Sequence, residues 1–236
     1  KGEQGISSTR NFWKRHPNIT LLGVIEDEGE KPYHIFKKNN LKIGMISYAF
    51  TVKNSLGKKG RFKMNLLSNA NEKIIISDLD ELRRNSDFVI VCVHWTKNTQ
   101  STPTKEQLKW AKFFADNNVD LVIGTRLHQV QPISYVKGKT GKMTLVYFSL
   151  GDLVSTEKKA KYSLGGLANI VITKRGNETI LSNYGIIPLV TSSDKKGTNY
   201  SSFKLREYSS LVEKIEDPKL KKEKSKDLMK WEALCE

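Results

Sequence analysis

The stretch that decides the fold is residues 87–124, DFVIVCVHWTKNTQSTPTKEQLKWAKFFADNNVDLVIG. It begins with a strand-like stretch over 87–95, in which residues 88–93 are all apolar, and ends with a second one over 120–123, in which residues 121–123 are apolar. Short runs rich in β-branched residues are typical of strands in the interior of a sheet. The segment between them is long enough for one helix. This strand–helix–strand order predicts a parallel α/β core.

The connecting segment carries a helix start signal. Pro103-Thr104 with Gln107 forms a capping box, and the helix is expected to run to about Asn117. Leu108, Ala111 and Phe114 recur at helical spacing. We therefore expect these three side chains to face the sheet.

Residues before this core predict a hairpin and a second helix. The turn Asn39-Asn40 links a short strand to an apolar strand over 41–50. Asn69, followed by Glu72 three residues later, predicts a capped helix to about Arg84.

Residues after the core follow a different pattern, which is typical of β-hairpins. Glycines at 138–141 and at 176 mark the turns of two further hairpins. The prediction is therefore an α/β (α+β layered) fold with a mixed sheet. Residues 1–190 are expected to form one domain portion, and residues 191–236 a polar, basic segment with short helices.

The chain has 236 residues, with 40 Lys+Arg against 25 Asp+Glu and a formal net charge of +15. This excess indicates either a polyanionic partner or a solvated Lys-rich surface. Zinc-finger spacing is absent from the sequence, and aromatics do not alternate with the basic runs, so nucleic acid is not an expected partner. No apolar run approaches the ~20 residues of a membrane-spanning helix. The opening residues, KGEQGISSTRNFW, lack Met and a signal-peptide pattern, which favours an excised or mature segment.

Polar side chains follow the predicted strands at their carboxyl ends, where α/β sheets gather their sites. They are His94 and Asn98 after the first strand, Arg126 and His128 after the second, and Asp152 after a later one. Because one helix joins the first two strands, His94 and His128 are expected to converge. Two imidazoles with a carboxylate suit Zn, Mn or Fe. The alternative is that each histidine is a structural residue bonded into the core.

A family resemblance rests on three stretches. Residues 94–107 resemble a His-Trp-Gly-x-Glu strand end followed by Pro-[Thr/Ser]-x-x-Gln, and GTRLHQVQP (124–132) resembles Gly-x-His-Pro-His-x-x-Gln-Pro. YFSLGDLV (147–154) resembles a Tyr-Ser-Leu-Gly-Asn-Phe signature. Together these stretches resemble the CapA-like family of poly-γ-glutamate capsule synthesis. The likeness runs in order from residue 1 to about 190.

The resemblance implies a calcineurin-like metallophosphoesterase fold, a β-sandwich flanked by helices with metals at strand ends. It implies a protein that is membrane-anchored at the cell surface, through a segment outside this chain, and works with other capsule-synthesis membrane proteins. The family's first metal-ligand motifs would precede residue 1. The chain is therefore expected to be the C-terminal part of the domain, completed by a missing N-terminal part.

Departures from the family pattern lie at the site itself. Arg126 replaces the first histidine of the His-x-His pair, Asn98 replaces the glutamate, and Asp152 replaces the asparagine. Arginine is always charged and has no lone pair for a cation. It can instead bind a carboxylate or phosphate directly. We therefore expect a modified, weakened metal site.

Two functional hypotheses follow. In the first, the protein handles poly-γ-glutamate or another anionic polymer during capsule synthesis, export or anchoring, with Arg126, Asn98 and Gln131 in contact with the polymer. In the alternative, it is a metal-dependent hydrolase of phosphoesters or polyglutamate. There His94 and His128 would be catalytic, and His94, His128 and Asp152 would bind a divalent metal.

Overall fold

The structure is a computed structural model that describes residues 2–26, 29–50, 62–96, 100–157, 159–176, 178–194, 198–214 and 218–232. The chain forms two compact units. The first, named the sheet unit, comprises Lys1–Thr96, Lys105–Gly124 and Ser134–Val146. The second, named the hairpin unit, comprises Lys97–Thr104, Thr125–Ile133 and Tyr147–Glu236.

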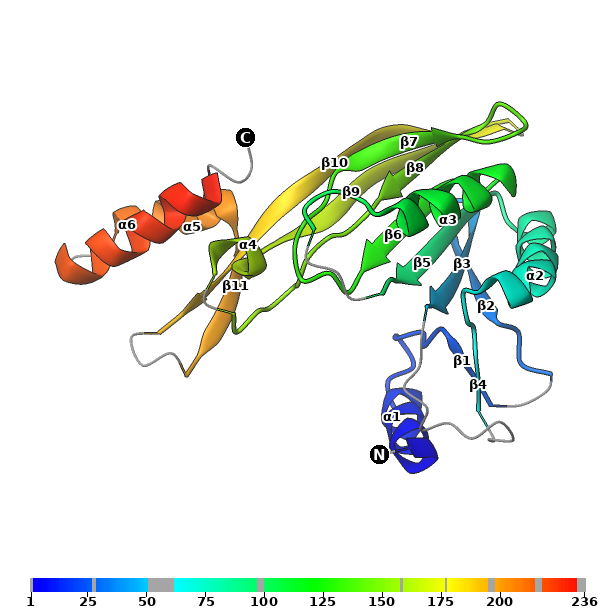
Figure 1. Cartoon of the computed structure of the whole chain (residues 1–236), viewed down its shortest axis with the longest axis horizontal. Helices are drawn as coiled ribbons and strands as arrows, with labels where there is room; N and C mark the ends of the chain where they lie inside the picture. Colours follow the sequence, from blue (N-terminus) through cyan, green and yellow to red (C-terminus); the bar gives the residue numbers. More distant parts are fainter. Residues whose placement is uncertain are drawn as a thin grey trace. The chain divides into compact units, whose positions relative to one another are not determined.

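The sheet unit is built on a mixed sheet with the strand order β2-β3-β5-β6-β8-β7 (Figure 1). Its strands are β2 (Tyr33–Lys38), β3 (Leu41–Ala49), β5 (Phe88–His94), β6 (Leu121–Thr125), β7 (Ile133–Lys137) and β8 (Met143–Tyr147). Strands β3 and β5 pair in parallel. The predicted hairpin pairs β2 with β3 through Asn39 and Asn40, whose φ angles are 49° and 62°. Asparagine tolerates this left-handed conformation better than most residues. The α/β class with a mixed sheet is confirmed.

Helices and short strands complete the sheet unit. They are α1 (Gly2–Lys14), β1 (Val24–Ile25), β4 (Lys63–Met64), the 3₁₀ turn η1 (Asn69–Asn71), α2 (Glu72–Asn85) and α3 (Lys105–Asp116). Figure 1 shows α3 lying alongside β5 and β6. Val91, Ala111 and Phe114 are fully buried in the resulting core. Each large apolar side chain removed from water stabilises the fold by roughly 1.5–3 kcal/mol.

Two expectations about helices are wrong in detail. Leu108 is 49% exposed and does not face the sheet, because the buried stripe of α3 runs through Gln107, Trp110, Ala111 and Phe114. Leu108 lies about 100° away from Gln107 around the helix axis. Asn69 does not cap α2. It lies in the preceding 3₁₀ turn, and its side-chain oxygen accepts a hydrogen bond from Lys109 at 2.8 Å.

A buried carboxylate links the elements of the sheet unit. Asp120, immediately before β6, is 8% exposed and accepts a hydrogen bond from the backbone N–H of Val89 on β5 at 2.7 Å. Its two oxygens also form ion pairs with Arg83 of α2 and with Lys142. Because each oxygen has a charged partner, this buried carboxylate is compensated.

The hairpin unit carries an antiparallel sheet in the order β11-β10-β9. Its elements are α4 (Ala160–Ser163), β9 (Leu164–Arg175), β10 (Glu178–Ser193), β11 (Tyr200–Lys204), α5 (Leu205–Glu213) and α6 (Pro218–Glu232). The β9–β10 hairpin was predicted and is confirmed, although its turn residue Asn177 lies outside the described residues. Strand β10 continues past residue 190, the end of the domain portion expected from the sequence, to Ser193.

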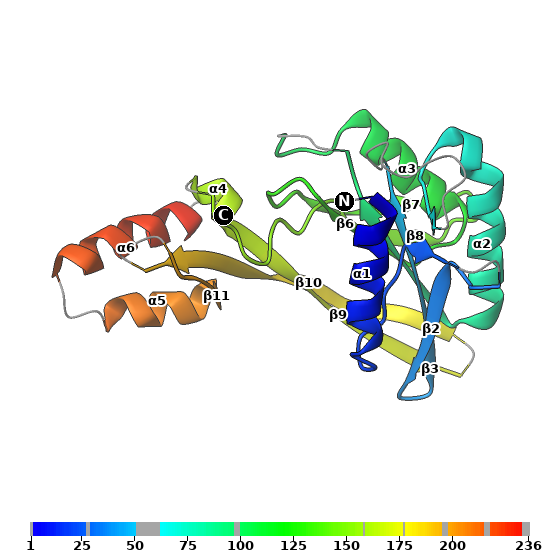
Figure 2. The ribbon, with the colours of Figure 1, turned by 90° about the horizontal axis from the view of Figure 1, so that it is seen from below.

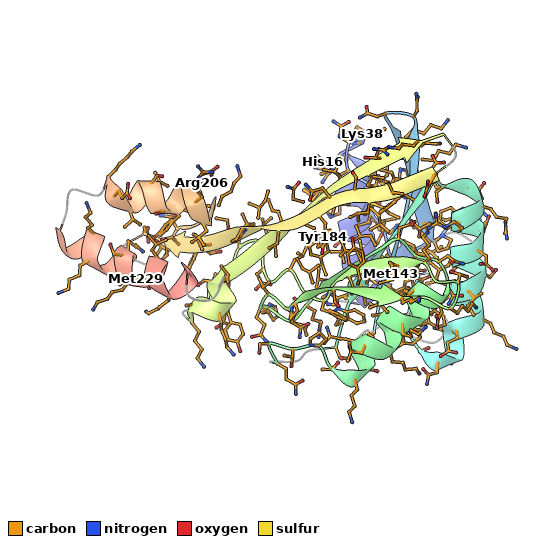
Figure 3. The ribbon with its side chains drawn as sticks, turned by 90° about the horizontal axis from the view of Figure 1, so that it is seen from above. His16, Lys38, Met143, Tyr184, Arg206 and Met229 are labelled. Carbon is orange, nitrogen blue, oxygen red and sulfur yellow. The ribbon has the colours of Figure 1, made fainter. Side chains whose placement is uncertain are left out.

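The helices of the hairpin unit pack on the sheet and on each other. Leu164 and Val190 of the sheet pack with Tyr208 and Val212 of α5, and Leu228 of α6 packs against this cluster. Figure 2 shows α5 and α6 side by side. In Figure 3, Tyr184 marks β10, and Arg206 and Met229 mark the two helices. None of the helices in the described parts of the chain has the length and apolar character needed to cross a bilayer.

Candidate functional site

The loop that follows β6, residues 125–131, is held in place by alternate side chains. Leu127, Gln129 and Gln131 are buried, each with 2–3% exposure. The amide of Gln129 donates to the carbonyl oxygen of Gln100. The amide of Gln131 donates to the same oxygen at 3.0 Å and to that of Thr102 at 2.9 Å. Buried amides that are paired in this way fix a backbone. The loop is therefore a fixed backbone for Arg126 and His128, which flank the buried Leu127.

Arg126 and His128 both adopt left-handed backbone conformations. Their φ angles are 88° and 57°. A non-glycine residue in such a region costs on the order of 1–3 kcal/mol and persists only where the surroundings impose it. Such residues cluster at binding and catalytic sites. The buried anchors of the loop supply the packing that holds both residues there.

His128 faces Asp152, the residue after Gly151. Its Nδ1 lies 2.9 Å from one carboxylate oxygen of Asp152 and 3.1 Å from the other. The side chain of His128 is 51% exposed and that of Asp152 is 27% exposed. The sequence places these residues in separate motifs, and the structure brings them into direct contact within the hairpin unit.

Backbone contacts set the position of Asp152. The N–H of Gln131 donates to the carbonyl of Ser149 at 3.0 Å, and Val130 and Leu150 form an isolated β-bridge. The loop of His128 and the segment of Asp152 are thus hydrogen-bonded to each other through the main chain.

Glycines allow β9 to pass close to this segment. Gly151 has a φ of 67°, and a Cβ there would lie 2.8 Å from the carbonyl oxygen of Leu164. A Cβ at Gly165 would overlap the carbonyl oxygen of Asp152 itself. Only glycine fits such a close approach of two backbones.

The remaining predicted residues are placed as follows. His94 ends β5, with an exposed side chain and a carbonyl that accepts the N–H of Phe50 at 3.1 Å. It belongs to the sheet unit and His128 to the hairpin unit, so their convergence stays a prediction. Asn98 lies outside the described residues. Gln131 anchors the loop, and its contact with a substrate also stays a prediction.

The donor chemistry of the pair fits a divalent metal in part. Imidazole and carboxylate are ligands that Zn, Mn and Fe accept, whereas Arg126 in the same loop has no lone pair to offer a cation. Among the residues that the structure describes, no group of three or more His, Cys, Asp or Glu gathers around a common point. If a metal binds here, His128 and Asp152 are the residues of this unit that would hold it.

Sequence reasoning missed the anchoring role of Leu127 and Gln129. The signal that could have found it is alternation: positions 127, 129 and 131 carry one apolar and two amide side chains, with Arg126 and His128 between them or beside them. Alternation in a loop is a weak signal, because loops have no fixed period.

A comparison with known families matches residues 1–157 to PGA_cap, described as bacterial capsule synthesis protein. A curated relative, the PGA biosynthesis protein CapA of Bacillus subtilis (strain 168), is 23% identical over 224 residues. The match covers 93% of this chain and 57% of the relative, so the chain spans a little over half of that protein's length.

Solved structures show a partial likeness. The Thermus thermophilus sulfate thiohydrolase SoxB in complex with glycerol has a TM-score of 0.47 and 11% identity, over 78% of this chain and 30% of that one. A hypothetical protein from the same organism, Thermus thermophilus, has a TM-score of 0.42 and 13% identity, over 69% of this chain and 64% of that one. At these TM-scores and identities the solved structures add nothing to the family match.

Proposed function

The chain belongs to the PGA_cap family of bacterial capsule synthesis proteins, and from this premise we propose that it handles poly-γ-glutamate or another anionic polymer at the cell surface. The polymer would be handled during its synthesis, export or anchoring. Membrane anchoring through a segment outside this chain, and other capsule-synthesis membrane proteins as partners, are part of the proposal. The observation that carries it is Arg126, held by its loop beside the His128–Asp152 pair.

Arginine suits a carboxylate-bearing polymer for a geometric reason. Its planar guanidinium donates parallel hydrogen bonds to both oxygens of a carboxylate. A loop fixed by buried amides lowers the entropy lost when the contact forms. The formal net charge of +15 would attract the polymer over a longer distance. The fixed position of Arg126 in the loop would make the contact specific. The overall positive charge would raise the rate at which the protein and the polymer meet.

A binding experiment tests this proposal. We expect Arg126→Ala in the full-length protein to weaken binding of poly-γ-glutamate by about tenfold or more, and Arg126→Lys to fall in between. Arg175→Ala is the matched control, because Arg175 is an exposed arginine at the end of β9 and its loss changes the charge equally. Isothermal titration calorimetry at two salt concentrations gives the affinities.

If the Arg126→Ala and Arg175→Ala variants lost equal affinity for poly-γ-glutamate, the proposal would be contradicted, because charge alone would then account for binding. DNA of similar charge serves as the second ligand. Equal affinity for DNA and polyglutamate would indicate a general polyanion surface.

The His128–Asp152 pair favours a second candidate, metal-dependent hydrolysis with a bound water as nucleophile. Metal bound there would lower the pKa of that water, and His94 would be a further ligand. The test is metal content by mass spectrometry of the full-length protein beside His128→Ala. A stoichiometric metal that is lost in the variant, together with hydrolysis of phosphoesters or polyglutamate, supports this candidate. A protein without metal in both forms contradicts it.

A further inference from the structure

A cavity of about 330 Å³ lies within the hairpin unit. Its lining comes from the segment 155–157, from α4, from the end of β10 with the start of β11, and from α6. Helix α4 packs against both α6 and β10, which brings these parts together around one space (Figure 1). The volume is at the lower end of the ~300–1,000 Å³ that is usual for small-molecule sites. The cavity therefore has room for one small molecule or one unit of a polymer.

Hydroxyl side chains make up most of the lining of this cavity. Ser155, Ser163 and Thr191 are among them, and these three residues are only 5–8% exposed. Among the described residues of the lining, Ala160 is the one aliphatic residue. Polar groups that are withdrawn from water need hydrogen-bonding partners. A cavity of this composition suits a ligand that carries many hydrogen-bonding groups, and it does not suit an apolar ligand.

The register of the sheet explains why hydroxyl groups gather here. Across β10 and β11, Thr191 pairs with Ser202 and Ser193 pairs with Tyr200. Opposite residues of an antiparallel pair share a face, as do residues two apart along a strand. The four hydroxyl side chains therefore occupy one face of the strand pair, whereas Val190 on the other face belongs to the apolar cluster with α5. Because α4 and α6 line the same cavity, part of the hydroxyl face is enclosed.

Hydrogen bonds hold the walls of the cavity in place. Thr191 Oγ1 accepts the backbone N–H of Ser155 at 3.1 Å, which joins β10 to the segment before α4. The ammonium group of Lys224 on α6 donates to the carbonyl oxygen of Ser193 at 3.0 Å. A site whose walls are already fixed loses less conformational entropy when a ligand binds.

The charged residues of α6 restrict the charge of the ligand. Glu223, Lys224, Asp227 and Lys230 line the cavity and follow helical spacing along one side of α6. Lys224 is engaged by a backbone carbonyl, and Lys230 lies 3.6 Å from Asp227. Within the part of the chain that the structure describes, no ion pair involves Glu223. The two lysines disfavour a divalent cation, and the three carboxylates, which include Glu157, disfavour an anionic ligand.

We infer that this cavity is a binding site for a neutral sugar residue. Sugar hydroxyls donate and accept hydrogen bonds, so they match both the hydroxyl side chains and the carboxylates of the lining. Glu223 accepts hydrogen bonds from the sugar hydroxyls. Tyr200, which is 37% exposed, offers a ring face against which the C–H groups of a sugar ring pack. The inference does not rest on the proposed function, because Arg126 does not line this cavity.

Titration of the ¹⁵N-labelled full-length protein with sugars tests the inference. The probes are glucose, galactose and N-acetylglucosamine, and binding is followed in ¹H–¹⁵N correlation spectra. We expect at least one of them to bind with a dissociation constant of millimolar order, as is usual for a polar ligand of this size. We expect Glu223→Gln and Tyr200→Ala each to weaken that binding by about tenfold. Glu223 is an exposed helix residue, so its variant keeps the test decisive if Tyr200→Ala fails to fold.

Each variant has a matched control. Glu213→Gln removes an exposed carboxylate from the neighbouring helix α5, and Tyr184→Ala removes a tyrosine of β10 that is 43% exposed. Neither residue lines the cavity, so both controls should bind the sugar as the wild type does.

Three results would overturn the inference. The first is that none of the three sugars changes the spectra. The second is that a sugar binds but its affinity is the same in Glu223→Gln and Tyr200→Ala as in the wild type, because the sugar would then bind elsewhere. The third is tighter binding of free glutamate or of spermidine than of any of the sugars, which would indicate a site for an amino acid or for an amine.

Discussion

Asp120 in the sheet unit immediately precedes β6, whereas Asp152 in the hairpin unit lies in the segment between β8 and β9, and the surroundings of the two aspartates differ. Asp120 is buried, with Arg83, Lys142 and the N–H of Val89 around its two oxygens. Asp152 is partly exposed and faces one imidazole, which is itself half exposed. Removing a buried carboxylate whose oxygens are all compensated destabilises the fold strongly, because its charged partners are left uncompensated. A carboxylate paired with a half-exposed histidine contributes little to the stability of the fold.

The largest effect is expected at Asp120. We expect Asp120→Ala to lower the free energy of unfolding by about 3–5 kcal/mol, because Arg83 and Lys142 would be left near each other without their partner. Urea unfolding followed by circular dichroism measures it. Asp80→Ala, an exposed aspartate on α2, is the control and should change the value by less than about 0.5 kcal/mol. Similar values for the two variants would remove the distinction between the aspartates.

Gly165 tests whether packing of β9 fixes Asp152. We expect Gly165→Ala to cost about 1–3 kcal/mol, because the new methyl group overlaps the carbonyl oxygen of Asp152 and the backbone must move. The measurement is again urea unfolding. Gly185→Ala on β10 is the matched control, because a Cβ there meets nothing within 4 Å. A Gly165→Ala protein as stable as Gly185→Ala would show that the close approach of β9 does not confine Asp152.

A third aspartate, Asp78 on α2, sharpens the comparison because its charge is poorly compensated. Burial, and then the negative charge of Glu81, raise its pKa from 3.8 to about 6, although Lys31 opposes the shift. The folded protein therefore holds a proton more tightly than the unfolded chain between about pH 4 and 6. Stability is lost as the pH rises through this window.

We expect Asp78→Asn to be more stable than the wild type by on the order of 1 kcal/mol at pH 8, and nearly equal to it at pH 4, after allowance for solvent screening at this half-buried position. Unfolding curves at the two pH values give the difference. An advantage for the variant that is equal at both pH values would show that the charge of Asp78 is not its cause.

The smallest effect on stability is expected at Asp152. Because its pair with His128 is partly exposed, Asp152→Ala should cost no more than about 1 kcal/mol. Thermal or urea unfolding beside Asp120→Ala makes the comparison direct. If Asp152→Ala lowered the free energy of unfolding as much as Asp120→Ala does, Asp152 would serve the fold and not the site.

Periodicity predicted most of the elements in this chain. The apolar runs predicted β5 and β6, the Asn39-Asn40 pair predicted the turn of the first hairpin, and the glycines at 138–141 and at 176 predicted the turns of the later ones. The buried face of α3 was predicted in part: Ala111 and Phe114 are buried and Leu108 is not. When the buried face of a helix is inferred from only three residues, the rotation of the helix about its axis is uncertain by about one residue, which is about 100°.

The candidate site was predicted as a set of residues and not as an arrangement. Arg126, His128 and Asp152 were identified from their places after strands. Their geometry depends on the left-handed backbone of the loop and on anchors in residues 100–102, which have no periodic signal. Side-chain chemistry alone also could not say that Asp152 contacts His128.

By itself, the sequence determined the α/β class, the strand–helix–strand core and the residue types available for chemistry, because these depend on local periodicity and composition. Only the tertiary structure decided that Nδ1 of His128 meets a carboxylate 24 residues away. That contact depends on main-chain hydrogen bonds between two loops and on a strand that passes where only glycine fits. Interactions of this kind join distant parts of the chain, and no local pattern encodes their distance.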